Sequence, residues 1–143
     1  MKKLIGAEIK SLQNMIARQL DNHFMQVGDC AISGPNAFML KYLKDNPDKD
    51  IFQKDFEQIL STTKSTCSKV LSKMEEKGFI KREGVSDARY RKIILLPRGK
   101  EIVEKTTEFI DEYEKKMLTG LTDEQIETFL ECITVMKKNI SQD

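Results

Sequence analysis

Residues 63–95 of this 143-residue chain read TKSTCSKVLSKMEEKGFIKREGVSDARYRKIIL. Apolar side chains recur at three- and four-residue steps from Cys67 to Met74, the period of a helix with one buried face. Thr62 or Thr63 can cap the start of this helix, and Gly78 ends it. Two short strand-like runs follow at residues 79–82 and 91–95, separated by a polar turn. The stretch therefore predicts a helix that ends near residue 77, followed by a β-hairpin.

Further helices are expected on both sides of this stretch. The periodicity predicts a long helix at residues 7–27, a second that opens at Ser33-Gly34-Pro35 and stops at Asn46-Pro47, and a short one around Phe56. Pro97 opens a fifth helix, and Thr122 with Gln125 forms a capping box for a sixth. This order predicts a mainly α protein with a small β-hairpin, a winged helix–turn–helix.

The flanking helices are long, and their apolar stripes exceed what one small winged domain can cover. We therefore expect a homodimer. The predicted organisation is a single domain, 1–143, in which residues 1–30 and 98–143 are dimerisation helices and residues 33–97 are the winged-helix part.

The formal net charge of +1 conceals an uneven distribution. Residues 61–100 carry 11 basic and 4 acidic side chains, a net charge of +7. Residues 101–143 carry 5 basic and 11 acidic side chains, a net charge of −6. Such a basic segment favours a surface that binds a polyanion. Ordinary solvated helix faces are the alternative, so the charge needs support from the residue pattern.

The outward face of the helix after Thr63 combines lysines with small hydroxyl side chains. Its members are Lys64, Ser65, Ser68, Lys69, Ser72 and Lys73, whereas Cys67, Val70, Leu71 and Met74 form the face expected to be buried. Small side chains let a helix approach base edges closely, and lysines neutralise phosphates. This face is typical of a helix that lies in the major groove of DNA.

The hairpin carries a second basic group. Its residues are Lys81, Arg82, Arg89, Arg91 and Lys92. Asp87 lies two positions before Arg89 and can brace its guanidinium for entry into a narrow minor groove. A turn-forming aspartate beside a surface arginine is the alternative.

Several segments resemble the MarR (multiple-antibiotic-resistance regulator) family along essentially the whole chain. They are Gln53-Lys54-Asp55-Phe56-Glu57, Thr63 to Ser68, Met74 to Arg82, Asp87-Ala88-Arg89, Lys92 to Leu95, and Gly99. The resemblance implies an obligate dimer whose recognition helices enter successive major grooves of a pseudo-palindromic operator. It also implies that Arg89 reaches the minor groove, and that Lys64, Ser65, Ser68 and Lys69 occupy the recognition-helix positions.

Two departures from the family pattern stand out. Leu96 occupies the position where the family has a capping threonine before the fifth helix, and Pro97 presets that helix start instead. Met15 and Ile16 occupy the region where the peroxide-sensing branch has a reactive cysteine, which argues against redox sensing.

The sequence thus predicts a sequence-specific dimeric transcriptional regulator, a repressor, that binds double-stranded DNA under the control of a small-molecule effector. The effector is expected between the dimerisation helices and the winged-helix part. The predicted DNA-binding residues are Thr63, Lys64, Ser65, Ser68, Lys69, Arg82, Asp87, Arg89, Arg91 and Lys92. A winged helix that binds another protein and no operator is the alternative. Steep weakening of duplex binding with salt would favour the DNA-binding hypothesis.

Other chemistry finds little support. The chain has one histidine, His23, and three widely spaced cysteines, Cys30, Cys67 and Cys132, so we expect neither a metal nor a cofactor. Cys30 is the cysteine expected to be reachable. No phosphate loop, nucleophile elbow or paired carboxylates indicate an enzyme. No run is long and apolar enough to span a membrane, and the predicted location is the cytoplasm.

Overall fold

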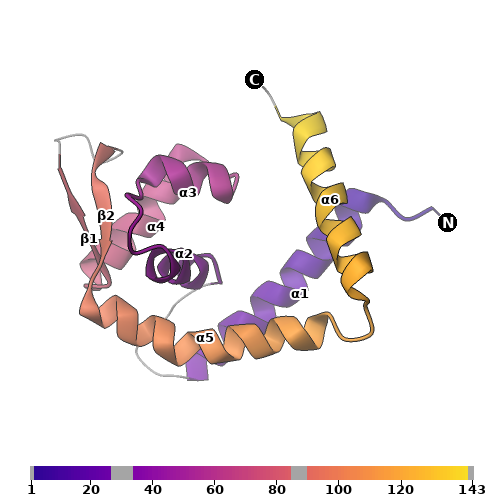
Figure 1. Ribbon diagram of the computed structural model, residues 1–143, viewed down its shortest axis with the longest axis horizontal. Coiled ribbons are helices and arrows are strands. Elements are labelled where there is room, and N and C mark those ends of the chain that lie inside the picture. The colour runs from indigo at the N-terminus through magenta and orange to yellow at the C-terminus, as the bar shows by residue number, and fades with distance from the viewer. Residues whose placement is uncertain (1, 27–33, 85–89, 142–143) are drawn as a thin grey trace. The chain divides into compact units, whose positions relative to one another are not determined.

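The computed structural model describes residues 2–26, 34–84 and 90–141 (Figure 1). The elements are α1 (Ile5–Gln26), α2 (Gly34–Asp45), α3 (Gln53–Ile59), α4 (Lys64–Glu76), β1 (Ile80–Glu83), β2 (Lys92–Leu95), α5 (Pro97–Met117) and α6 (Asp123–Ile140). The chain divides into two compact units, residues 1–107 and 108–143. The predicted fold class, mainly helical with one antiparallel hairpin, is confirmed.

Local side-chain hydrogen bonds fix where α3, α4 and α6 begin. Asp55 Oδ2 accepts a hydrogen bond from the Phe52 backbone N–H at 2.8 Å, which fixes the entry into α3. Thr63, rather than Thr62, caps α4, since its Oγ1 accepts from the Thr66 backbone N–H at 3.2 Å. The predicted capping box of α6 is confirmed by reciprocal hydrogen bonds between Thr122 and Gln125 at 2.9 and 3.1 Å.

The chain leaves α4 through a glycine in the left-handed region. Gly78 has φ of 77°, and the Gly78 and Phe79 backbone N–H groups donate to carbonyls of the last turn of α4. The chain then enters β1, which pairs with β2 in the register Ile80↔Leu95 to Glu83↔Lys92. The first strand begins one residue later than expected.

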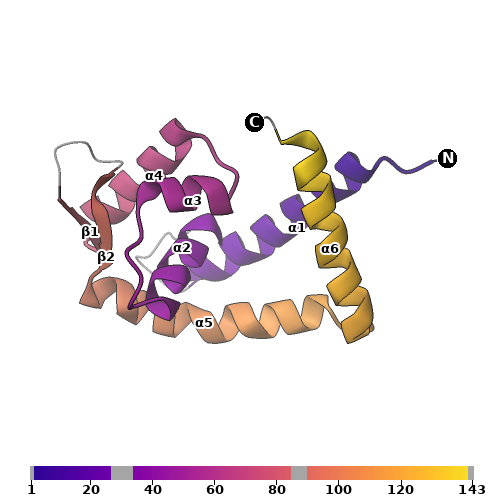
Figure 2. The same cartoon turned by 45° about the horizontal axis from the view of Figure 1, so that its top comes forward.

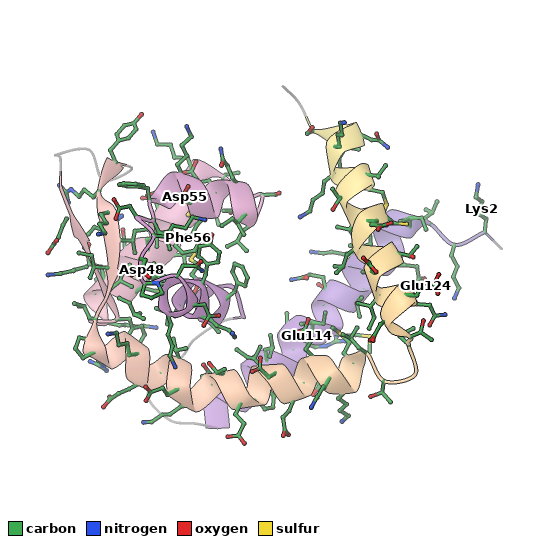
Figure 3. The ribbon with its side chains drawn as sticks, viewed as in Figure 1. Lys2, Asp48, Asp55, Phe56, Glu114 and Glu124 are labelled. Carbon is green, nitrogen blue, oxygen red and sulfur yellow. The ribbon has the colours of Figure 1, made fainter. Side chains whose placement is uncertain are left out.

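The core of the unit formed by residues 1–107 lies under α3 and α4. Figure 2 shows these two helices side by side, with the hairpin at one end. Phe56, labelled in Figure 3, is fully buried, and its ring packs edge-on against Tyr42 of α2 with centroids 5.8 Å apart. The Ile93 backbone N–H donates to the Ile51 carbonyl at 2.8 Å, so the loop before α3 holds the base of the hairpin.

The unit formed by residues 108–143 has no core of its own. None of its described residues, 108–141, is buried. Phe129 and Leu130, both on the predicted apolar stripe of α6, are 54% and 59% exposed. In the first unit, α1 likewise exposes Ile5, Ile9 and Met15. Within the described residues, no helix has both the length and the apolarity needed to cross a membrane.

Candidate nucleic-acid interface

The two faces of α4 differ as the sequence predicts. Cys67, Leu71 and Met74 are buried, while Val70, expected with them, is only half-buried. On the other face Lys64, Ser65, Lys69 and Lys73 are exposed, and Ser68 and Ser72 are half-buried. The helix therefore presents ammonium and hydroxyl groups on a rigid element held by the core.

The beginning of α4 is suited to anions. The first backbone N–H groups of a helix lack partners within the helix and favour negative charge. Thr63 uses its side chain locally, because Oγ1 accepts from the Thr66 N–H and lies 2.9 Å from Thr66 Oγ1. Exposed Lys64 and Ser65 follow directly, so the charge of a lysine adds to the positive end of the helix.

Arg82 has a different environment from the one expected of a DNA contact. Its side chain is only 7% exposed, and Nη2 donates to Glu75 Oε1 at 3.1 Å and to Ser72 Oγ at 3.2 Å. Its backbone N–H donates to Glu75 Oε2 at 3.1 Å. The guanidinium lies against α4 instead of facing solvent, and we remove Arg82 from the predicted DNA contacts.

Lys81 and Lys92, on the two strands of the hairpin, lie at the surface. Lys92 is exposed and pairs with Asp50 at 2.9 Å, and Lys81 pairs with Glu83 at 2.6 Å. Exposed pairs of this kind contribute little free energy, so these lysines can exchange carboxylates for phosphates. Arg91 is half-buried.

Some predicted site residues lie outside the described residues. These are Asp87 and Arg89 of the hairpin turn, and Cys30 before α2. The His23 backbone is part of α1, but its side chain is likewise outside what the structure describes. Next to the turn, Tyr90 is exposed and adds an aromatic ring to the hairpin surface.

The sequence did not reveal a cavity at the base of the hairpin. It has a volume of about 430 Å³ and lies among the end of α2, the loop before α3, β2 and the first turn of α5. Its lining includes the apolar residues Leu43, Ile51, Ile93, Ile94 and Leu95 and the basic residues Lys44, Lys49, Lys92 and Lys100. Because four separate parts of the chain build it, no periodicity in any one of them could have indicated it.

Two of the three cysteines, Cys67 and Cys132, lie within the described residues. Burial raises the pKa of the Cys67 thiol to about 11, the Glu57 carboxylate adds to the rise, and the Arg82 guanidinium opposes it. A thiol with this pKa stays protonated and unreactive near neutral pH. Cys132 is exposed on α6. Within the described residues no three histidine, cysteine, aspartate or glutamate side chains are grouped to hold a metal ion.

Comparison with known proteins gives one family. Residues 32–89, which include α2, α3, α4 and β1, match the model of the MarR family. No curated protein sequence matches the chain.

Solved structures are similar over nearly the whole chain. The MepR–DNA complex of Staphylococcus aureus superposes with a TM-score of 0.81 at 24% identity, covering 96% of this chain and 97% of that chain. MarR from Oenococcus oeni PSU-1 has a TM-score of 0.80 at 20% identity, covering 94% and 99%. The heme sensor protein PefR from Streptococcus agalactiae, in complex with heme, has a TM-score of 0.61 at 28% identity, covering 99% and 97%. The likeness thus includes the long terminal helices as well as the winged part.

Proposed function

We propose that the chain is a transcriptional regulator of the MarR family, whose model residues 32–89 match, and that it represses transcription by binding a pseudo-palindromic DNA operator as a homodimer. The outward face of α4 is the observation that carries this proposal. Its exposed lysines, exposed Ser65 and half-buried Ser68 stand on a helix whose opposite face is fixed in the core. MepR, which has the same fold, has been solved in complex with DNA.

We assign the DNA contacts by position. Lys64 and Lys69 neutralise phosphates, and Ser65 and Ser68 let the helix approach base edges in the major groove. Thr63 caps the helix and adds a hydroxyl at its positive end. In the hairpin, Arg91 and Lys92 contact phosphates, and Arg89, braced by Asp87, enters the minor groove.

The homodimer is supported by the uncovered apolar surface of the terminal helices. The stripe on α6 leaves Phe129 and Leu130 more than half exposed, and α1 exposes Ile5 and Met15. Isolated exposed apolar residues are ordinary, but a row of them along a helix marks an interaction surface, and α1 and α6 each carry one. A second copy of the chain supplies the same surface in return, as two-fold symmetry requires.

A small-molecule effector is the remaining part of the proposal. The cavity at the base of the hairpin is its candidate site, because an occupant would contact β2 and the first turn of α5 together. Apolar walls with lysines at the edge favour a small organic anion. A thermal shift with octanoate that is absent with octanol, and is lost in Lys44→Gln/Lys100→Gln, would support this site.

The test of DNA binding is its salt dependence. The affinity for a nonspecific duplex should fall steeply between 50 and 200 mM salt, since binding to phosphates releases counterions. A winged helix that binds only other proteins would show no salt-dependent duplex binding. A sequence selected from a random pool should then bind far more tightly than the nonspecific duplex at the same salt.

A further inference from the structure

The contact between Arg82 and the last turn of α4 has no part in the proposed DNA contacts. One carboxylate, that of Glu75, accepts from both the backbone N–H and the guanidinium of Arg82, and Ser72 Oγ accepts from the same guanidinium nitrogen. One turn of α4 therefore holds both the backbone and the side chain of Arg82 in β1. We name Ser72, Glu75 and Arg82 the wing brace.

We propose that the wing brace sets the position of the hairpin relative to the recognition helix, so that Arg82 is a positioning residue for DNA binding. The inference rests on the proposed function. It deepens that proposal by identifying what aligns the two DNA-binding elements, and it removes Arg82 from the contacts themselves.

The position of the brace on α4 supports this role. Ser65, Ser68, Ser72 and Glu75 follow one another at three- and four-residue steps, so they form a single stripe along the helix. The stripe begins with the serines assigned to base edges and ends at the brace. A shift of the hairpin at Glu75 would therefore be a shift relative to the same face that approaches the DNA.

Stability alone does not account for an arginine in this place. The Arg82 side chain is 7% exposed, and its Nε and Nη1 are buried without a hydrogen-bond partner among the described residues. Burying a guanidinium costs free energy that its ion pair only partly recovers, and well-packed apolar side chains often do as well or better. What the arginine adds is a directional, two-partner geometry between a helix and a strand.

Replacing Glu75 distinguishes the two possible roles of Arg82, because they predict opposite changes in DNA affinity. If Arg82 contacted phosphate directly, Glu75→Gln would remove a competing negative charge and strengthen DNA binding. If Arg82 positions the wing, Glu75→Gln weakens the brace and lowers operator affinity. The matched control is Glu76→Gln, the same change one residue later, at an exposed side chain with no hydrogen bond or ion pair in the described structure.

The probes are a duplex selected by the wild-type protein from a random-sequence pool and poly(dI-dC) as the nonspecific duplex. We expect Glu75→Gln to bind the selected duplex about tenfold more weakly, as befits loss of a charge-assisted hydrogen bond, and to bind poly(dI-dC) as wild type does. Glu76→Gln should bind both as tightly as wild type or more tightly. Binding of the selected duplex by Glu75→Gln that equals or exceeds wild type would overturn the proposal.

The salt slope gives a second arm. Arg82→Gln should weaken binding of the selected duplex and leave the slope of log affinity against log salt unchanged. A lost phosphate contact would reduce that slope by about one. Arg82→Lys, which keeps the charge but not the planar fork, should behave like Arg82→Gln. Rescue of affinity by lysine would indicate a simple charge and would overturn the brace.

A third arm requires no DNA. Amide hydrogen exchange of residues 80–83 and 92–95 should be faster in free Glu75→Gln than in wild type or Glu76→Gln, with exchange in α2 unchanged. Unchanged exchange in the hairpin would contradict the proposal even if Arg82 variants failed to fold. If wild type showed no salt-dependent duplex binding, the proposed function would fail. Hydrogen exchange would still show whether the wing brace holds the hairpin.

Discussion

Gly99 is a residue on which the junction between α5 and the hairpin depends. A Cβ atom at this position would lie 2.4 Å from the Phe79 carbonyl oxygen and 2.7 Å from Leu95 Cδ1. That carbonyl is held in place, because it accepts the hydrogen bond from the Leu96 backbone N–H at 2.9 Å. We expect Gly99→Ala to lower the free energy of unfolding by about 1–3 kcal/mol, the usual cost of overpacking.

Urea denaturation measures this effect, and Gly6→Ala is the control. A Cβ atom at Gly6 would meet nothing within 4 Å. Alanine there should leave stability unchanged or raise it by up to about 1 kcal/mol, because glycine is the poorer helix former. A Gly99→Ala protein as stable as wild type would show that α5 moves away from β1 at no cost.

Cys67 predicts a pH dependence at the alkaline end. Burial raises the pKa of its thiol in the folded protein from the ordinary 9.0 to about 11. Well below pH 9 the thiol is neutral in both states and contributes no slope. Between pH 9 and about 11 the unfolded chain loses the proton while the folded protein keeps it, so the free energy of unfolding falls as pH rises.

Denaturation at a series of pH values tests this assignment. Between pH 9 and 11 the wild-type protein should lose stability more steeply than Cys67→Ala. Cys132→Ala, which removes an exposed thiol, should keep the wild-type slope. Parallel curves for wild type and Cys67→Ala would mean that the thiol is not desolvated in the folded protein.

At the scale of elements, α4 could be predicted nearly completely from sequence. Its start at Thr63, its end before Gly78 and three of its four expected buried residues follow from capping, glycine conformation and apolar period, all of which are local. The start of α5 also depends on a local contact. The Leu96 carbonyl accepts from the Lys100 N–H at 3.0 Å, so α5 starts at Pro97 without the capping threonine.

Contacts between elements could not be predicted in this way. Composition alone predicts that any basic residue of the hairpin contacts DNA, because it does not show which face of the strand the residue occupies. Alternation along β1 was the available signal, because Ile80 is buried, Lys81 is exposed and Arg82 returns to the inner face. The cavity at the base of the hairpin left no comparable signal, since its lining comes from separate segments.

The recognition helix supports a prediction of its own. Ser68→Leu should change the rank order of the duplexes that the protein prefers, because a bulky side chain keeps the helix from the base edges. Lys69→Ala should instead weaken binding to every duplex by a similar factor and lower the salt slope by about one. Fluorescence anisotropy with a panel of duplexes separates the two effects. An unchanged rank order for Ser68→Leu would contradict base reading by this face.

For the molecule as a whole, the uneven distribution of buried surface is the dominant feature. Residues 34–107 contain every buried side chain in the described structure, whereas residues 108–141 contain none. A helix such as α6 with a capping box and an apolar stripe is well formed locally, but most helical stability in proteins comes from packing. The second unit therefore lacks the packing that would stabilise α6. We expect another copy of the chain to cover its apolar stripe.

Phe129→Glu tests that expectation, with Thr128→Glu as its control. Both variants add one negative charge to α6 at neighbouring positions, but Phe129 belongs to the apolar stripe and Thr128 lies outside it. Light scattering at micromolar concentration should give twice the mass of the chain for wild type and Thr128→Glu. Phe129→Glu should shift toward the mass of a single chain and melt at a temperature that depends on concentration, because an unpaired carboxylate would be buried in the dimer. Truncation before Thr122 should have the larger effect and leave monomeric or insoluble protein. A wild-type mass of one chain, or a stable dimer for Phe129→Glu, would mean that the stripe on α6 is not the dimer interface.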